Sequence, residues 1–131
     1  MNKEVIYYPE EIADAVERFE TPFFLYSEAR IRDNCRRFRD AFRKCFPDFE
    51  ALYAVKANNN PTVVKIIMEE EFGLDCSSRT EAWLCKKLGG SGMYTANYTP
   101  ADELAYARDC GLVLNLDDVS NLEGLEVPEV L

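Results

Sequence analysis

Lys56 is the residue of this chain best placed to do chemistry. It directly follows Leu52-Tyr53-Ala54-Val55, an apolar run that predicts a strand, and therefore stands at the carboxyl end of that strand. Partial desolvation at such a position lowers the pKa of a lysine, and the neutral amine is then a nucleophile able to form a Schiff base. The other interpretation is a strand-end lysine that extends its ammonium into solvent.

The composition narrows the chemistry further. The 131 residues contain no histidine, which excludes Ser–His and Cys–His catalysis within this chain and most catalytic zinc sites. The five cysteines form no C-x-x-C pair, so the sequence indicates neither a disulfide framework nor a metal site. Cys35 and Cys45 are expected to fill the core, and Tyr53 and Tyr94 to pack rather than to react.

Charge and hydropathy restrict the partners and the location. The net charge of −9 argues against a nucleic-acid partner, because binding phosphates requires a basic surface. No apolar run is long enough to cross a membrane, and the first residues lack the pattern of a signal peptide. We therefore expect a cytoplasmic protein without a membrane partner.

Hydrophobic periodicity and capping residues predict a regular succession of elements. Helices are predicted at 8–19, between Ser27 and Pro47, and at 61–71, 79–88, 100–110 and 119–125. Strands are predicted at 23–26, 51–55, 73–76, 93–96 and 112–116. From residue 51 onward, strands and helices alternate with a period of about 20 residues, which predicts parallel strands joined by right-handed crossovers.

Two architectures contain strands joined in this way, an open doubly wound sheet and a closed (β/α)8 barrel. No Gly-rich phosphate-binding sequence follows the first repeat strand, which weakens the case for a dinucleotide-binding sheet. Four strands cannot close a barrel, and residues 127–131 look like the start of another strand. We therefore expect the first part of a longer protein, with a self-contained four-stranded sheet as the alternative.

Several segments resemble the fold-type III pyridoxal-phosphate-dependent amino-acid decarboxylases, the family of the diaminopimelate and ornithine decarboxylases. Tyr-Ala-Val-Lys-Ala-Asn at 53–58 is similar to the family's cofactor-lysine motif, and Asn59-Asn60-Pro61 fits the decarboxylases better than the alanine racemases. The other matching segments, in chain order, are 21–34, 73–81, 94–97 and 114–118. This ordered set is more specific than any single motif.

The resemblance implies an α/β fold, a partial (β/α)8 TIM barrel whose mouth binds pyridoxal 5′-phosphate. Residues 1–27 would form an amino-terminal helix and strand leading into the barrel, and residues 28–131 its first, truncated part. Lys56 would be the catalytic residue and hold the cofactor as a Schiff base, with Asp75 beside it helping to set its charge. The further candidate cofactor-binding residues are Ser78, Glu81 and Asn97.

The weaker candidates also have purely structural interpretations. Asp75 could be a strand-end carboxylate without a role, and Ser78 could simply cap a helix. Glu81 could pair with the amides of a first helical turn or with a nearby lysine, and Asn97 could satisfy the backbone of a turn.

The implied reaction is the α-decarboxylation of a small amino-acid substrate by a carboxy-lyase. The segment 21–34 favours meso-diaminopimelate, which would yield lysine, whereas 75–81 favours ornithine, lysine, arginine or carboxynorspermidine. The alternative from another functional class is a non-catalytic homologue that binds a protein partner, and a racemase fits 59–61 poorly.

The family's phosphate loop, its pyridine-nitrogen carboxylate and its dimer-shared site are expected beyond residue 131. This chain alone should therefore be inactive, and the complete protein is expected to be a homodimer.

Overall fold

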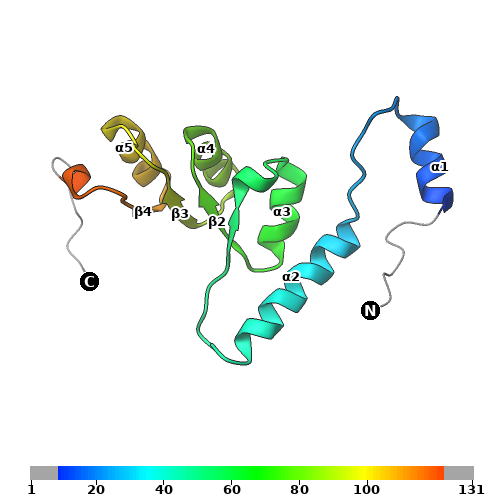
Figure 1. Ribbon diagram of the computed structural model, residues 1–131, viewed down its shortest axis with the longest axis horizontal. Coiled ribbons are helices and arrows are strands. Elements are labelled where there is room, and N and C mark those ends of the chain that lie inside the picture. The colour runs from blue at the N-terminus through cyan, green and yellow to red at the C-terminus, as the bar shows by residue number, and fades with distance from the viewer. Residues whose placement is uncertain (1–8, 123–131) are drawn as a thin grey trace.

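A sheet of four parallel strands, ordered as in the sequence, organises this protein (Figure 1). The computed structural model describes residues 9–122. The strands are β1 (Leu52–Ala54), β2 (Gly73–Cys76), β3 (Gly92–Thr95) and β4 (Val113–Asn115). The helices between them are α3 (Pro61–Glu69), α4 (Arg79–Leu88) and α5 (Ala101–Asp109). Short 3₁₀ turns follow β1 at Val55–Ala57 and β4 at Val119–Leu122. The predicted alternation of strands and helices is confirmed, whereas the strand expected at 127–131 lies outside the described residues.

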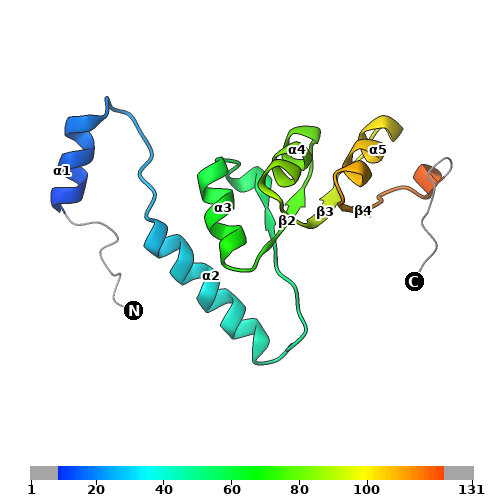
Figure 2. The ribbon, with the colours of Figure 1, turned by 180° about the vertical axis from the view of Figure 1, so that it is seen from behind.

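The two faces of the sheet have different surroundings. Both ribbon views place α3, α4 and α5 on the same side of the strands (Figures 1 and 2). Side chains on that side form the core, with Leu74, Cys76 and Tyr94 almost completely buried. Because side chains alternate along a strand, Ala54 and Asp75, which pair directly in the parallel register, belong to the opposite face.

The amino-terminal part contains α1 (Pro9–Arg18) and α2 (Glu28–Arg43), of which α2 lies along α3 while α1 stands apart from the sheet (Figures 1 and 2). The strand predicted at 23–26 is wrong: these residues form no regular element, and Phe24 is 88% exposed. An apolar extended segment becomes a strand only when another strand accepts its hydrogen bonds, and none does so among residues 9–122.

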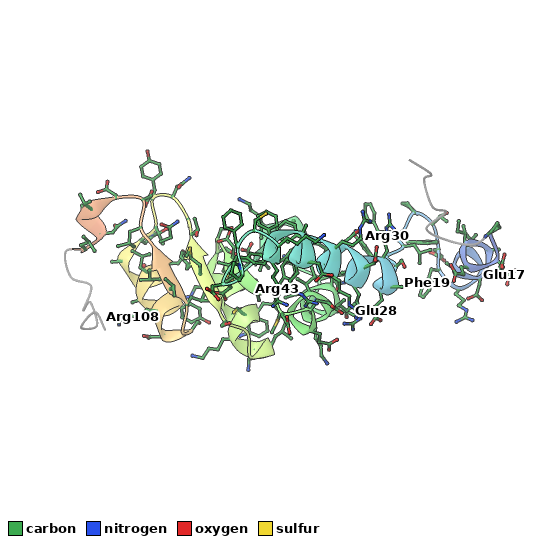
Figure 3. All side chains as sticks on the ribbon, turned by 90° about the horizontal axis from the view of Figure 1, so that it is seen from below. Glu17, Phe19, Glu28, Arg30, Arg43 and Arg108 are labelled. Atoms are coloured by element: carbon green, nitrogen blue, oxygen red, sulfur yellow. The ribbon has the colours of Figure 1, made fainter. Side chains whose placement is uncertain are left out.

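Ion pairs rather than deep burial attach α2 to α3. No residue of α2 is buried, and Cys35 on this helix is half-buried. Cys45, just beyond the helix, is exposed, so the expectation that it fills the core is wrong. Instead Glu70, only 5% exposed at the end of α3, accepts hydrogen bonds from Arg36 at 2.8 Å and from Arg32 at 3.1 Å. Figure 3 shows the side chains along α2, with Glu28 and Arg43 labelled at its two ends. The hydrogen bond from Arg36 is the main reason why the pKa of Glu70 falls to about 2.

Close approach of β2 and β3 depends on Gly92. This residue has φ +155°, and a Cβ atom added to it would lie 1.9 Å from the carbonyl oxygen of Leu74. We expect Gly92→Ala in the complete protein to lower the free energy of unfolding by about 3 kcal/mol or more, because backbone must move apart at the centre of the sheet. The measurement is denaturant unfolding.

Gly89→Ala is the matched control for this variant. Gly89 ends α4 in the left-handed conformation at φ +71°, and a Cβ atom there would meet nothing within 4 Å. It should therefore cost only about 1–2 kcal/mol, the backbone penalty alone. Equal losses for the two variants would contradict the steric argument.

The ion pairs of Glu70 should make stability depend on acid pH. The pKa of Glu70 is lower in the folded protein than its ordinary value of about 4.5. The ionised carboxylate therefore adds its full contribution to the free energy of unfolding above pH 4.5, and this contribution is lost as the pH falls toward 2. We expect Glu70→Gln to lower the thermal unfolding temperature at pH 7, with a difference from the unsubstituted protein that shrinks below pH 4.5. Glu69→Gln is the control. It removes a partner of Arg32 that is more exposed than Glu70, so it should lower the unfolding temperature less. A Glu70→Gln effect that is constant with pH would refute this assignment.

Candidate functional site

Lys56 lies where the sequence predicts, at the carboxyl end of β1. It is the middle residue of the 3₁₀ turn Val55–Ala57. Val55 is completely buried and anchors this turn in the core, whereas Lys56 is exposed. The prediction that Lys56 is partly desolvated is therefore wrong in the described part of the chain. There, α3 to α5 cover only the other face of the sheet.

Asp75 lies on the strand adjacent to that of Lys56. Within β2 it pairs with Ala54 of β1 on one side and with Met93 of β3 on the other. Lys56 is two residues beyond Ala54, so the amine and the carboxylate come from neighbouring strands near their carboxyl ends. In the described part of the chain, the buried Oδ1 of Asp75 has no hydrogen-bond partner. Such an oxygen is costly unless a donor reaches it, so Asp75 marks a place where a further polar group fits.

Ser78 and Glu81 together form the amino-terminal cap of α4. The hydroxyl oxygen of Ser78 accepts a hydrogen bond from the Glu81 backbone N–H at 3.3 Å. In return, Oε2 of the buried Glu81 accepts from the backbone N–H of Ser77 at 2.7 Å. This reciprocal arrangement is a variant of the capping box. In the usual form, the glutamate accepts from the backbone N–H of the capping serine itself, whereas here it accepts from Ser77, one residue earlier. Both side chains therefore have structural roles, and their contact with a cofactor stays a prediction.

Asn97 lies in the bend after β3 and is exposed. The next residue, Tyr98, has φ +53°, and its backbone N–H donates to Oδ2 of Asp117 at 2.9 Å. This hydrogen bond ties the loop that follows β3 to the loop that follows β4. It keeps the bend of Asn97 at the carboxyl edge of the sheet, although a cofactor contact of Asn97 is untested.

Two contributors to this edge escaped the sequence analysis. Asp117 lies in a segment that matched the family, but only the fold reveals that it accepts from the Tyr98 amide. Tyr53 was expected only to pack, yet its hydroxyl donates to the backbone oxygen of Asn58 at 3.2 Å. A tyrosine three residues before the candidate lysine, next to a polar loop, was the available signal for this contact.

The arrangement can hold a carbonyl compound. A primary amine attacks an aldehyde carbon, and the orphaned Asp75 oxygen offers an acceptor to polar groups of the same molecule. Lys56 and Asp75 thus fit pyridoxal phosphate, which combines an aldehyde with a polar ring. Among residues 9–122, no three His, Cys, Asp or Glu side chains are grouped to hold a metal ion. In the same residues, no helix is long and apolar enough to cross a membrane.

Comparison with known proteins gives consistent matches. Residues 28–128 match the family "Pyridoxal-dependent decarboxylase, pyridoxal binding domain". Diaminopimelate decarboxylase of Methanothermobacter thermautotrophicus is 39% identical over 116 residues, 84% of this chain and 27% of that relative. Ornithine decarboxylase 2 of Drosophila melanogaster is 37% identical over 71 residues, 52% of this chain and 18% of that protein. The lysine/ornithine decarboxylase of Vibrio vulnificus, solved with putrescine, superposes with a TM-score of 0.73 at 24% identity, covering 94% of this chain and 33% of its own.

The capping role of Ser78 can be tested by substitution. Ser78→Ala removes the acceptor for the Glu81 N–H, so we expect the free energy of unfolding of the complete protein to fall by about 1 kcal/mol. Ser78→Thr keeps a hydroxyl at the same position and should retain most of the stability. If denaturant unfolding gave both variants the same loss of stability, the capping hydrogen bond would not be how Ser78 stabilises the protein.

Proposed function

We propose, on the premise that this chain belongs to the pyridoxal-dependent decarboxylase family and forms part of its pyridoxal-binding domain, that it carries the cofactor lysine of an amino-acid decarboxylase. Lys56 is that lysine in our proposal, and meso-diaminopimelate is the substrate. The product would be lysine.

Family membership confirms three predictions made from the sequence: the family itself, pyridoxal phosphate as its cofactor and the partial-barrel α/β fold. The chain spans only about a quarter of the length of the curated relative from Methanothermobacter. The activity, the substrate and the homodimer of the complete protein are therefore proposals. The division at residue 27 also stays a prediction.

One observation carries the proposal: the amine of Lys56 and the orphaned Oδ1 of Asp75 come from adjacent parallel strands, close to their carboxyl ends. In parallel α/β folds, this edge is where ligands bind. The segment that contains both residues also lies entirely within the family match.

The residues would divide the work as follows. Lys56 would bind the cofactor through Nζ, and the same nitrogen, when free, can hold a proton for transfer to the product. Asp75 would accept a hydrogen bond at Oδ1, and its negative charge favours a protonated group beside it. Ser78 and Glu81 would support the site by fixing the start of α4, and Asn97 would border its rim. When bound, pyridoxal phosphate supplies the electron sink for loss of the carboxylate as carbon dioxide.

The proposed substrate rests on the relatives. The match to a diaminopimelate decarboxylase extends over much more of this chain than the match to an ornithine decarboxylase. Ornithine, lysine, arginine and carboxynorspermidine remain the alternative substrates for the same site. A non-catalytic homologue that binds a protein partner is the alternative of another class. A binding protein has no need of a lysine at the end of one strand and an unpaired carboxylate oxygen on the next, which favours the enzyme.

Covalent trapping tests the proposal directly. The complete protein is loaded with pyridoxal phosphate and reduced with borohydride, and its peptides are mapped by mass spectrometry. We expect the label on Lys56 and its loss in Lys56→Ala. Lys65→Ala is the matched control, because Lys65 is an exposed lysine on α3 and its removal should leave the label in place.

The outcomes separate the alternatives. A label on Lys56 with carbon dioxide released from diaminopimelate supports the full proposal, whereas release from ornithine, lysine, arginine or carboxynorspermidine would replace the substrate. A label on another lysine, or none, would overturn the catalytic assignment in favour of the non-catalytic homologue.

A further inference from the structure

We propose that Tyr53 is a positioning residue for Lys56: its hydroxyl holds the turn that carries the lysine in the orientation that binds the cofactor. This inference rests on the proposed function of Lys56. It assigns to Tyr53 a role in the site although its side chain lies on the other face of the sheet.

The register of the sheet shows that Tyr53 acts from behind the site. Tyr53 pairs with Leu74, which is completely buried in the core on the helix side. Ala54 and Asp75 form the neighbouring pair and lie on the opposite face. The ring of Tyr53 therefore belongs to the helix side, away from Asp75, and any effect on the cofactor must pass through the backbone.

The backbone that Tyr53 reaches is the one that follows Lys56. Its hydroxyl donates to the carbonyl oxygen of Asn58 at 3.2 Å, across the 3₁₀ turn Val55–Ala57. The donor and the acceptor thus enclose Lys56 in the sequence, and the hydrogen bond closes a short loop around it. With Val55 buried below, this bond fixes the turn at a second point.

The hydrogen bond from Tyr53 to Asn58 braces the lysine turn, and Asn58 continues this brace to α3. Its side-chain oxygen accepts from the backbone N–H of Asn60 at 3.0 Å. The side-chain oxygen of Asn60 in turn accepts from the Thr62 N–H at 2.9 Å and caps α3. Successive hydrogen bonds therefore link β1, the lysine turn and the first turn of α3, so a displacement of the turn would break several of them.

The surroundings of Tyr53 strengthen its hydrogen bond. The ring lines an apolar groove of about 410 Å³ between α2, α3 and β1, together with Cys35, Phe38 and Ile67. Burial raises the pKa of Tyr53, so its hydroxyl stays protonated and able to donate. The hydrogen bond to Asn58 is part-buried, so water weakens it less than a fully exposed one.

The brace counteracts the exposure of Lys56. An exposed lysine samples many rotamers, and fixing its backbone removes part of the freedom that cofactor binding would otherwise have to restrict. Without the Tyr53 hydroxyl, we expect the bound cofactor to be held more weakly and in a less uniform orientation.

The test uses the complete protein with Tyr53→Phe, which removes only the hydroxyl. We expect its affinity for pyridoxal phosphate, measured by absorbance titration, to fall about 2- to 12-fold, the range for one lost hydrogen bond. At equal occupancy and well below the unfolding temperature, the visible circular dichroism of the bound cofactor should also be weaker. That signal reports how uniformly the achiral cofactor is oriented, and a loss of stability alone would not change it.

Tyr94→Phe is the matched control. Tyr94 is a buried strand tyrosine whose hydroxyl donates to Glu103, far from the lysine turn in sequence, so its removal should lower stability and leave affinity and dichroism unchanged. Asn58→Ala tests the same turn by another route, because it keeps the backbone oxygen that Tyr53 binds but removes the acceptor for the Asn60 N–H. If Tyr53→Phe fails to fold and Asn58→Ala leaves both the affinity and the dichroism unchanged, the turn does not position the cofactor and the role of Tyr53 is overturned.

The wild-type protein separates the two proposals. If Lys56 is not labelled in the unsubstituted protein, the proposed function fails whatever Tyr53 does. If Lys56 is labelled and Tyr53→Phe keeps both the affinity and the dichroism of the unsubstituted protein, the positioning role is overturned. The same holds if Tyr94→Phe loses as much of both as Tyr53→Phe.

Discussion

The close contact between β2 and β3 is the constraint on which the rest of the structure depends. Any residue with a Cβ atom at position 92 would force the two strands apart, because that atom would lie 1.9 Å from the carbonyl oxygen of Leu74. This contact belongs to the register in which Asp75 pairs with Met93, while β1 places Ala54 on its other side. The register in turn sends Leu74 into the helix-side core and Asp75 to the opposite face. Packing and chemistry are thus set by the same pairing of strands.

The sequence predicts those elements best whose limits are set by local chemistry. Helix α4 begins and ends where predicted, because Ser78 caps its first turn and Gly89 adopts the left-handed conformation after its last. The failures are features that depend on distant partners. The segment 23–26 has the composition of a strand, but in the described residues no strand pairs with it. Cys45 follows an amphipathic pattern, yet it is exposed, because it lies beyond the last residue of α2 and no other described element covers it.

The candidate site was predictable in position but not in its supporting contacts. An apolar run followed by a lysine is enough to place Lys56 at the end of a strand. The orphaned oxygen of Asp75 and the hydroxyl contact of Tyr53 depend on where the chain returns after a turn, which periodicity does not encode. Family resemblance supplied the chemistry proposed for Lys56, and the fold revealed the contact through which we propose that Tyr53 positions it.

The order of the strands has a consequence for how the molecule is made. Because β1, β2, β3 and β4 are neighbours in the sheet in the order of the sequence, partners in adjacent strands are only about 20 residues apart. A chain leaving the ribosome can therefore add each new strand to an edge that has already emerged, without waiting for a distant segment. Lys56, just after β1, and Asp75, within β2, both precede β3 and β4 in the chain. The strand segments that carry these two candidate residues can thus pair early, before β3 and β4 have left the ribosome.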